Sequence, residues 1–151
     1  MHINPDHFLQ TERGRVVTPE RNKAAWDQCY EALAIELVRQ GPDSKVFVLI
    51  GPQGAGKSTW ARTYATQHPT AIIFDAILVK RTERAPILQA VSSQSGEAVA
   101  VWFQTPLDAC IARNALRAVD ERVSEQAIRN VHAAVEAPTV DEGFDNILTI
   151  P

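Results

Sequence analysis

Four short runs of apolar residues are separated by longer stretches in which apolar residues recur at every third or fourth position. The short runs are rich in Val, Ile and Phe, as buried strands are, and they span residues 45–50, 70–75, 98–103 and 146–150. The longer stretches predict helices over residues 19–40, 59–66 and 83–95, and two more that begin near Thr105 and Ser124. Strands that alternate with helices predict an α/β fold, with a mainly parallel sheet flanked by helices on both faces.

Hydroxyl residues mark the expected helix starts. The pairs Thr18-Pro19 and Thr105-Pro106 each place a capping hydroxyl before a proline at the first helical position. Thr82 and Ser124 are the expected caps of two further helices. Gly41-Pro42 ends the long helix that begins at Pro19.

The segment Gly51–Ser58 fits the phosphate-loop pattern G-x-x-x-x-G-K-[S/T] and lies between a predicted strand and a predicted helix. In this context backbone N–H groups and a helix N-terminus face the phosphates of a nucleotide. Lys57 is expected to reach the β- and γ-phosphates, and the Ser58 hydroxyl to bind Mg²⁺. The predicted nucleotide-binding residues here are Gly51, Pro52, Gln53, Gly54, Ala55, Gly56, Lys57, Ser58 and Thr59. The fold is therefore predicted to be a three-layer P-loop NTPase fold.

Length and composition limit the number of domains, the kinds of partner and the location of the protein. A length of 151 residues favours one domain over residues 1–151, and a formal charge of −3 argues against broad nonspecific binding of nucleic acid. No apolar run approaches the roughly 20 residues that cross a bilayer, and no secretion signal is visible, so we expect a cytoplasmic protein. Cys29 and Cys110 fall among apolar neighbours and are expected to be buried and unpaired, although a disulfide stays possible.

Asp75 ends a predicted buried strand, at the edge of the sheet where α/β proteins bind ligands. It is a candidate for holding Mg²⁺ or for orienting an acceptor hydroxyl, and the alternative is a carboxylate in a turn. Arg113 and Arg117 share a helix face, and Arg122 follows in a polar turn. Arginines on a segment that folds over a triphosphate can stabilise a phosphoryl-transfer transition state. The alternative is that these arginines are solvent-exposed charges on a helix.

The remaining charged and reactive residues give weaker signals. Lys80, Arg81 and Arg84 form a basic cluster that either contacts an acidic substrate or is surface charge, and we favour surface charge. The four histidines have no metal-ligand spacing, and no Ser/His/Asp or Cys/His arrangement stands out. The Asn-Lys-x-Asp signature of guanine binding is missing too, which favours ATP over GTP.

Several segments, taken together and in order from about Lys45, resemble a known family. They are 51–62, 74–81, 102–106, 112–114 and 142–145. These segments resemble the small P-loop kinases that include the kinase domain of phage polynucleotide kinase and, more distantly, zeta-type toxins. The resemblance implies that residues 113–137 form a lid, that Arg117 reaches the ATP phosphates, and that Arg113 lies against the nucleotide.

One departure from the family concerns the middle of the fold. The family has a strand, an acidic motif and a helix between the phosphate-loop helix and the strand that resembles residues 72–75, and here that piece is missing. The N-terminal segment Ile3–Leu9, followed by the helix over 19–40, has the missing form. We therefore hypothesise a circular permutation in which Asp6 is the general base and Arg13 or Arg15 grips the acceptor. The alternative is a loose arm over residues 1–17, with Asp75 serving the hydroxyl.

The function predicted from these features is an ATP- and Mg²⁺-dependent kinase that moves the γ-phosphoryl group to a hydroxyl. The resemblance implies an acceptor that is a small molecule or a nucleic-acid end. Its catalytic residues would be Lys57, Asp6, Asp75 and Arg117, and its metal ligands Ser58 and Asp75. One rival is a nucleotide-binding or ATPase module without transfer activity, which the missing middle piece favours because it leaves little room for an acceptor. Another is a toxin-like kinase that acts on a nucleotide sugar.

Overall fold

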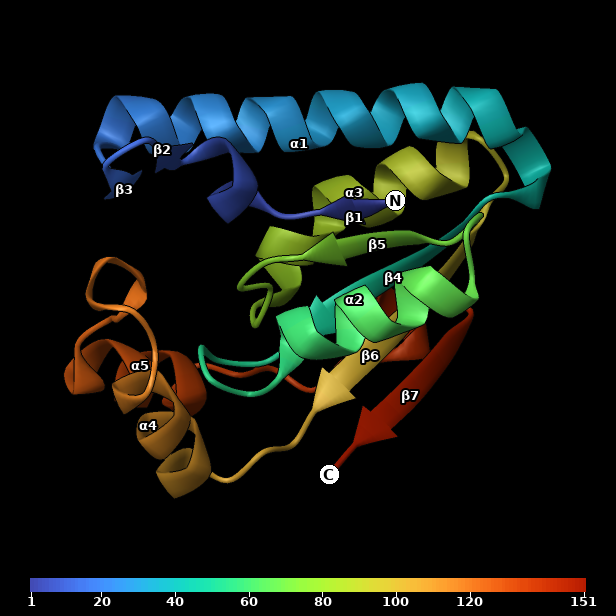
Figure 1. The fold of residues 1–151 in the computed structure, drawn as a ribbon. Helices are drawn as coiled ribbons and strands as arrows, with labels where there is room; N and C mark the ends of the chain where they lie inside the picture. Colours follow the sequence, from blue (N-terminus) through green and yellow to red (C-terminus); the bar gives the residue numbers. More distant parts are fainter.

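The computed structural model describes all residues, 1–151, and its centre is a five-stranded parallel sheet (Figure 1). The strand order is β1-β5-β4-β6-β7, and every neighbouring pair is parallel. The strands are β1 (His2–Ile3), β4 (Lys45–Ile50), β5 (Ile72–Asp75), β6 (Glu97–Phe103) and β7 (Asn146–Ile150). All four strands predicted from the apolar runs are confirmed.

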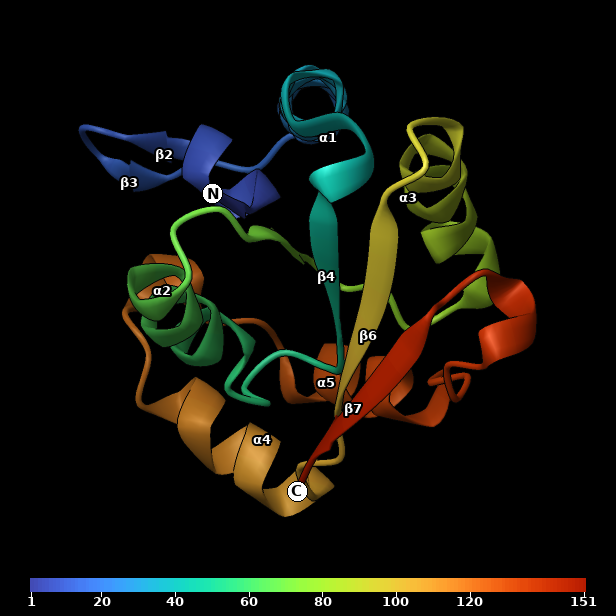
Figure 2. The same cartoon turned by 90° about the vertical axis from the view of Figure 1, so that its right-hand side faces the viewer.

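Five helices cover the two faces of this sheet, and Figure 2, which looks down the axis of α1, shows helices on either side of the strands. They are α1 (Pro19–Gln40), α2 (Lys57–Gln67), α3 (Arg81–Ser93), α4 (Leu107–Ala115) and α5 (Glu125–Ala133). The α/β three-layer fold predicted from the sequence is confirmed. Short 3-10 turns complete the chain: η1 (Pro5–Phe8), η2 (Gly41–Asp43), η3 (Val119–Glu121) and η4 (Val140–Glu142). A small antiparallel hairpin joins β2 (Gln10–Thr11) to β3 (Gly14–Arg15).

Two apolar cores lie on opposite faces of the sheet. Alternate residues of the central strands supply each core, for example Val48 toward α1 and α3, and Leu49 toward α2, α4 and α5. Because helices cover both faces, β4 is buried from Val46 to Ile50, which explains its unbroken apolar run. Cys29 and Cys110 are buried and free, one in each core, as expected, and burial raises the pKa of the Cys29 thiol to about 12.

The N-terminal segment belongs to the sheet. β1 pairs in parallel with β5, with Ile3 opposite Phe74, and the amino group of Met1 donates to the carbonyl oxygen of Ala71 at 2.7 Å. Ile3 and Leu9 are both buried. The N-terminal segment is therefore on the sheet, as the permutation hypothesis requires, and the alternative of a loose arm over residues 1–17 is wrong.

Two of the four predicted helix caps are confirmed. The Thr18 hydroxyl accepts from the backbone N–H of Arg21, and the Ser124 hydroxyl accepts from the N–H of Ala127. Thr82 is not a cap, because α3 begins one residue before it at Arg81.

Thr105 is not a cap either. Its buried hydroxyl donates 2.9 Å to the carbonyl oxygen of Ala55, and Pro106 occupies the N-cap position of α4 without a side-chain bond. The reason is a tertiary contact. Thr105 lies under the phosphate loop, and its hydroxyl bonds the loop backbone and is therefore not available to cap the helix.

Arg84 corrects the interpretation of the basic cluster. Its side chain is fully buried, and it forms two hydrogen bonds of 2.8 Å to the carboxylate of Glu142. It also donates to the carbonyl oxygens of Leu78, Val79 and Glu136. Arg84 is therefore neither surface charge nor a substrate contact; it ties α3 to η4 at the approach to β7.

We predict that Arg84→Met lowers the free energy of unfolding by about 3–5 kcal/mol, because it leaves the Glu142 carboxylate buried without its partner. Urea unfolding measures the loss. Lys23→Met is the matched control, since Lys23 forms an exposed pair with Asp27 and should change stability by less than about 1 kcal/mol. Equal effects of the two substitutions would contradict this role for Arg84.

Candidate functional site

The phosphate loop connects β4 to α2 and depends on two glycines with left-handed backbone angles. Gly54 has φ +78° and Gly56 has φ +98°, a conformation that L side chains rarely adopt. A Cβ atom on Gly54 would also collide with the backbone carbonyl of Cys110 in α4. The loop is thus closely packed between β4 and α4, and it leads directly into the N-terminus of α2, where backbone N–H groups have no helical partner.

Lys57 is folded back onto this loop. Its Nζ donates to the carbonyl oxygens of Gly51 at 2.7 Å and Pro52 at 2.9 Å, and its side chain is buried. Burial is the main reason why the pKa of Lys57 is lowered to about 8, and the positive charge of Arg117 acts in the same direction. An anion in the loop would relieve both effects, because it gives the ammonium group a counter-charge.

Asp75 is the acceptor of three side-chain hydrogen bonds at the end of β5. Its Oδ2 atom accepts from Ser58 Oγ at 2.7 Å and from Asn4 Nδ2 at 3.0 Å, and it lies 2.8 Å from His2 Nε2. The carboxylate is 2% exposed. Burial raises its pKa, but the hydrogen bonds from His2 and Ser58 outweigh burial and hold the pKa of Asp75 below its usual value. Asp75 is therefore a fixed anion beside the phosphate loop.

The donor set here fits Mg²⁺. Asp75 Oδ1 takes no side-chain hydrogen bond, and Oδ2 of the same carboxylate accepts from the Ser58 hydroxyl, so a hard cation would find a carboxylate and a hydroxyl oxygen on neighbouring side chains. The chain has no group of three or more His, Cys, Asp or Glu residues that could hold a metal. Mg²⁺ characteristically binds through one or two protein ligands and completes its shell with water and phosphate oxygens.

Asp6 lies in η1, directly after β1, and belongs to the same site. The Asn4 side chain joins the two acids, because its Oδ1 accepts from the backbone N–H of Asp6 at 2.8 Å while its Nδ2 donates to Asp75. Asp6 is less buried than Asp75: its side chain is 41% exposed and faces Arg15 Nη1 at 3.3 Å. One carboxylate is thus fixed at the phosphate loop, and the other is accessible beside it.

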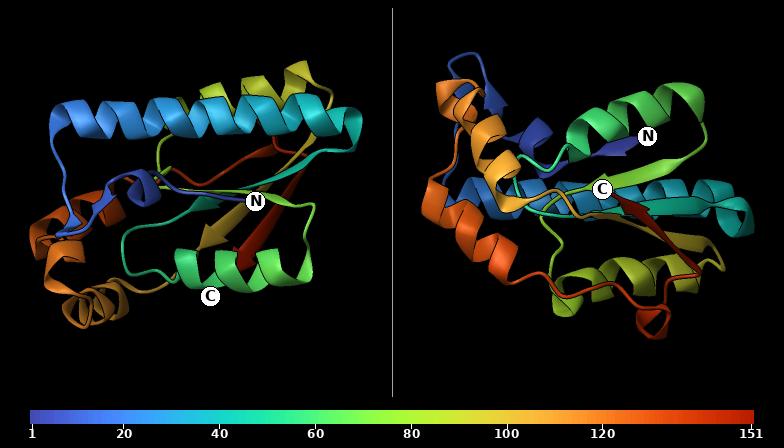
Figure 3. Two further views of the ribbon diagram at one scale, coloured as in Figure 1. Left: turned by 45° about the horizontal axis from the view of Figure 1, so that its top comes forward. Right: turned by 90° about the horizontal axis from the view of Figure 1, so that it is seen from below.

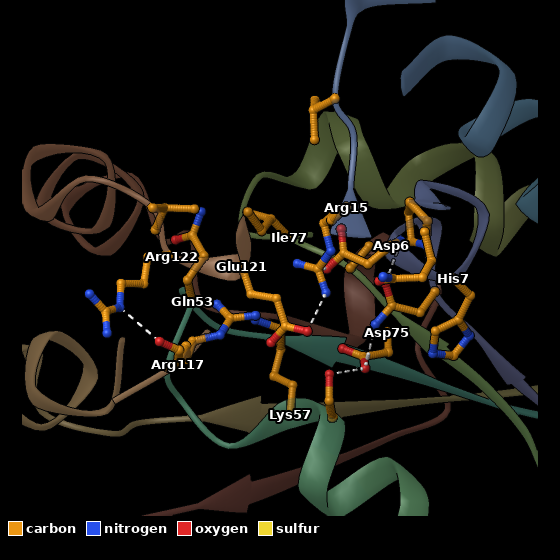
Figure 4. Close-up of a pocket in the computed structure, with 18 of the residues that line it drawn as sticks. Asp6, His7, Arg15, Gln53, Lys57, Asp75, Ile77, Arg117, Glu121 and Arg122 are labelled. Carbon is orange, nitrogen blue, oxygen red and sulfur yellow. Dashed lines mark hydrogen bonds and ion pairs between the residues drawn. The ribbon is translucent and has the colours of Figure 1, made fainter. Parts of the chain in front are cut away.

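The candidate Arg113 lies in α4, and Arg117 and Arg122 lie between α4 and α5. Arg113 Nη1 donates 3.4 Å to the carbonyl oxygen of Gly54 in the phosphate loop. Arg122 Nε donates to the backbone carbonyl of Arg117, and its guanidinium lies on the far side of the cavity from Asp75 (Figure 4). Asn114 secures this segment, because its buried side chain bonds both the N–H and the carbonyl oxygen of Val123.

A second connection runs from the N-terminal hairpin to this arginine-bearing segment, and the two lie side by side in Figure 3. The backbone N–H of Arg15 donates to Asp120 Oδ2 at 2.7 Å, and its Nη2 lies 3.7 Å from Glu121 Oε1. Gly14, with φ +98°, makes the approach possible, because a Cβ atom there would meet the Asp120 carboxylate at 2.7 Å. Arg15 therefore bridges Asp6 and the turn η3.

These parts line one cavity of about 900 Å³. This volume lies toward the upper end of the roughly 300–1,000 Å³ found for small-molecule sites. The predicted site residues that line it are Asp6, Gln53, Gly54, Gly56, Lys57, Ser58, Thr59, Asp75, Arg113, Arg117 and Arg122. Gly51, Pro52 and Ala55 belong to the loop but are buried and do not line the cavity. Arg13, one of the two predicted acceptor-binding arginines, does not line it either, whereas Arg15 does.

Sequence reasoning missed some residues of the site. His2 was set aside with the other histidines for lack of metal-ligand spacing, yet it contacts Asp75. Its role follows from the register of β1 on β5, which no local pattern in the sequence reveals. Asn114 had a signal, since the pair Arg113-Asn114 is part of the resemblance stated above. That signal did not show that the asparagine holds the backbone at Val123.

We predict that nucleotide binding takes up protons at pH 8–9. With a pKa of about 8, Lys57 is largely neutral at pH 9 in the free protein, and a bound triphosphate restores its ammonium form. Calorimetric titration in buffers of different ionisation enthalpy should show uptake that grows from pH 7 toward pH 9. The same series at pH 6–7 is the control, because Lys57 is already protonated there. Uptake that does not change with pH would contradict the lowered pKa.

Comparison with known proteins agrees with this geometry at a coarse level. The AAA domain family model AAA_33 matches residues 64–138, just under half of the chain, from the second half of α2 through α5. No curated protein matches the sequence. None of the helices combines the length and apolar character that crossing a bilayer requires. The match and the fold together indicate that this chain carries a nucleotide-binding P-loop NTPase-like domain.

Proposed function

We propose that the protein is an ATP- and Mg²⁺-dependent phosphotransferase that moves the γ-phosphoryl group to a hydroxyl acceptor. The observation that carries the proposal is the pairing of a phosphate loop with two carboxylates of different character in one cavity. Asp75 is buried and bonded to Ser58, whereas Asp6 is accessible and lies beside it through Asn4. A switch that only binds nucleotide needs the first carboxylate, whereas activation of a nucleophile that attacks the γ-phosphorus uses the second.

On the nucleotide side the chain supplies positioning and positive charge, which is what phosphoryl transfer requires of a protein. The N–H groups of the loop and of α2 bind the phosphates, and Lys57 leaves the loop carbonyls to follow the β- and γ-oxygens. Arg117 and Arg113 extend over the triphosphate from the segment 113–137, which we propose is a lid; Arg122 braces the backbone of that segment. Ser58 and Asp75 would hold Mg²⁺, which offsets charge on the phosphate oxygens.

On the acceptor side we assign the general base to Asp6 rather than Asp75. Asp75 Oδ2 already accepts three hydrogen bonds, and its lowered pKa makes it a poor proton acceptor. Asp6 is accessible and lies at the end of the neighbouring strand. It can accept a hydrogen bond from an acceptor hydroxyl and take the proton as the new P–O bond forms.

The strand order supports the circular permutation. β1, η1 and α1 supply a strand, an acid and a helix, and β1 occupies the sheet edge beside β5 although it comes first in the chain. We propose that the chain is one domain over residues 1–151, related to the polynucleotide-kinase-like P-loop kinases by this permutation. The rival hypothesis, a binding module without transfer, rested on a lack of room for an acceptor, and a cavity of about 900 Å³ removes that argument.

Lys57→Ala should strongly lower phosphoryl transfer and weaken ATP binding, because the substitution removes the only buried cation of the loop. Loss of a preorganised charge of this kind costs about 10²–10³-fold in turnover. Release of ADP, with and without acceptor compounds, measures the effect. Lys45→Ala is the control, since Lys45 lies at the other end of β4 and pairs with Glu97. Unchanged transfer in the Lys57 variant would overturn the assignment of the site.

Asp6→Asn and Asp75→Asn should separate the two carboxylates. Asp6→Asn should lower transfer to an acceptor by about 10²–10⁴-fold, because it removes the proton acceptor, and leave the affinity for MgATP nearly unchanged, because the ion partner of Asp6 is Arg15 and not a residue of the phosphate loop. Asp75→Asn should instead weaken the Mg²⁺-dependent part of nucleotide binding. Parallel measurements of MgATP affinity and of transfer give the comparison. The opposite pattern, with the binding defect in Asp6→Asn, would exchange the two roles.

A further inference from the structure

The acceptor end of the cavity has a different charge from the nucleotide end. Its walls are the N-terminal segment, the first turns of α1, and η3. These walls contribute the carboxylates of Asp6, Asp120 and Glu121, and one Arg or Lys side chain, Arg15. The other cations of the cavity stand on α2, on α4 and at Arg117 and Arg122, which flank η3; the Arg122 guanidinium lies on the far side of the cavity from Asp75 (Figure 4). The acceptor end is therefore acidic, in the part where a polyanionic substrate would need positive charge.

The single arginine at this end is already occupied. The Arg15 guanidinium faces Asp6 at 3.3 Å on one side and Glu121 at 3.7 Å on the other (Figure 4). Its side chain is 15% exposed. Nearby Arg21 does not line the cavity, and its guanidinium donates to the carbonyl oxygens of Val16 and Leu9. Arg62, on the helix after the phosphate loop, is exposed and donates to Thr59 of the same helix.

The uncharged residues at this end suit a polar compound without phosphate. Gln10 and Asn22 offer amide donors and acceptors, and His7 adds an imidazole whose pKa is lowered, mainly by burial. Trp26 is half-buried, lines the cavity, and lies 6.0 Å from the Phe74 ring, which holds the indole in place. A fixed aromatic surface beside amide side chains is the usual composition of a site for a small polar ligand.

We propose that the acceptor is an uncharged polyhydroxyl compound, a sugar or a nucleoside without phosphate, and that nucleic-acid ends and phosphorylated sugars are excluded. This inference rests on the proposed kinase function. The acceptor oxygen attacks the γ-phosphorus and forms a P–O bond, and the bond from the γ-phosphorus to the bridging oxygen of ADP breaks. The hydroxyl proton passes to the Asp6 carboxylate, so the products are a phosphate monoester, ADP and one proton.

The test uses matched acceptor pairs that differ by one phosphate. Adenosine is compared with adenosine 3′-monophosphate, glucose with glucose 6-phosphate, and a 5′-hydroxyl dinucleotide is added as a nucleic-acid end. Transfer of the γ-phosphoryl group from labelled MgATP is measured on the full chain. We expect the uncharged member of at least one pair to be phosphorylated, with a kcat/KM at least tenfold above that of its phosphorylated partner. Preference for a phosphorylated partner or for the dinucleotide would overturn the proposal, and so would a panel without any product.

A charge variant tests the reason for the exclusion. Glu121→Gln removes one of the two carboxylates that occupy Arg15, so binding of adenosine 3′-monophosphate should strengthen by roughly threefold to fivefold, the size of one partly exposed ion pair. Binding is measured by calorimetry with a non-hydrolysable ATP analogue and Mg²⁺ already bound. Glu97→Gln is the matched control, because the exposure of Glu97 is close to that of Glu121 and its partner Lys45 lies at the opposite end of the sheet. No gain in Glu121→Gln, or an equal gain in the control, would contradict the inference.

Different results would contradict the proposed kinase function and the proposed acceptor class. If MgATP does not bind, or if Lys57→Ala leaves its binding and turnover unchanged, the proposed kinase function fails. If MgATP binds and is turned over in a Lys57-dependent manner but only phosphorylated acceptors receive the phosphoryl group, the kinase function stands and the acceptor class is wrong.

Discussion

The Asp75 carboxylate holds together parts of the chain that no local pattern connects. Its Oδ2 atom meets His2 and Asn4 from the first four residues and Ser58 from the helix that follows the phosphate loop. A buried carboxylate is costly unless hydrogen bonds compensate it, and the three partners do so here. The consequence is a precise relation between the end of β5, the N-terminal strand and the phosphate loop. The cavity exists because these three segments converge on one oxygen atom.

The parallel sheet makes this convergence possible. Parallel strands place their carboxyl ends at one edge, so β1, β4 and β5 deliver Asn4, the phosphate loop and Asp75 to the same place. Asn4 links the position of Asp6 to that of Asp75, because its side chain bonds both the Asp75 carboxylate and the backbone N–H of Asp6. The accessible acid is therefore positioned relative to the fixed acid by one amide group. Arg15 extends the chain of contacts to the segment between α4 and α5, so that the two sides of the cavity are joined at its rim.

Local patterns in the sequence were enough to predict four of the five strands and all five α-helices, because the central strands β4, β5 and β6 are buried on both faces and read as unbroken apolar runs. The phosphate loop was predictable because its glycines and Lys57 form a contiguous sequence motif. Prediction failed where a tertiary contact took over a side chain. Thr105 bonds Ala55 in place of capping α4, and Arg84 is buried against Glu142, 58 residues away, although its neighbours suggested surface charge.

The site was predictable in part. Asp75 and Asp6 were both named from the sequence, but their different burial, which assigns different roles to them, depends on the pairing of β1 with β5. His2 and the bridge from Arg15 to Glu121 join residues far apart in the chain, and only the folded structure brings them together. The charge of the acceptor end likewise comes from residues of the N-terminal segment and of η3, which are separate in the sequence.

The most direct test of the account is a crystal structure of the protein with Mg²⁺ and a non-hydrolysable ATP analogue. The account predicts a triphosphate in the loop 51–58, with Lys57 turned from the carbonyl oxygens of Gly51 and Pro52 to the phosphates and with the metal ion at Ser58. Asp6 should face the γ-phosphorus across a space that admits a hydroxyl. A loop without nucleotide, with Lys57 still on the two carbonyl oxygens, would contradict the account, as would an Asp6 carboxylate that points away from the γ-phosphate.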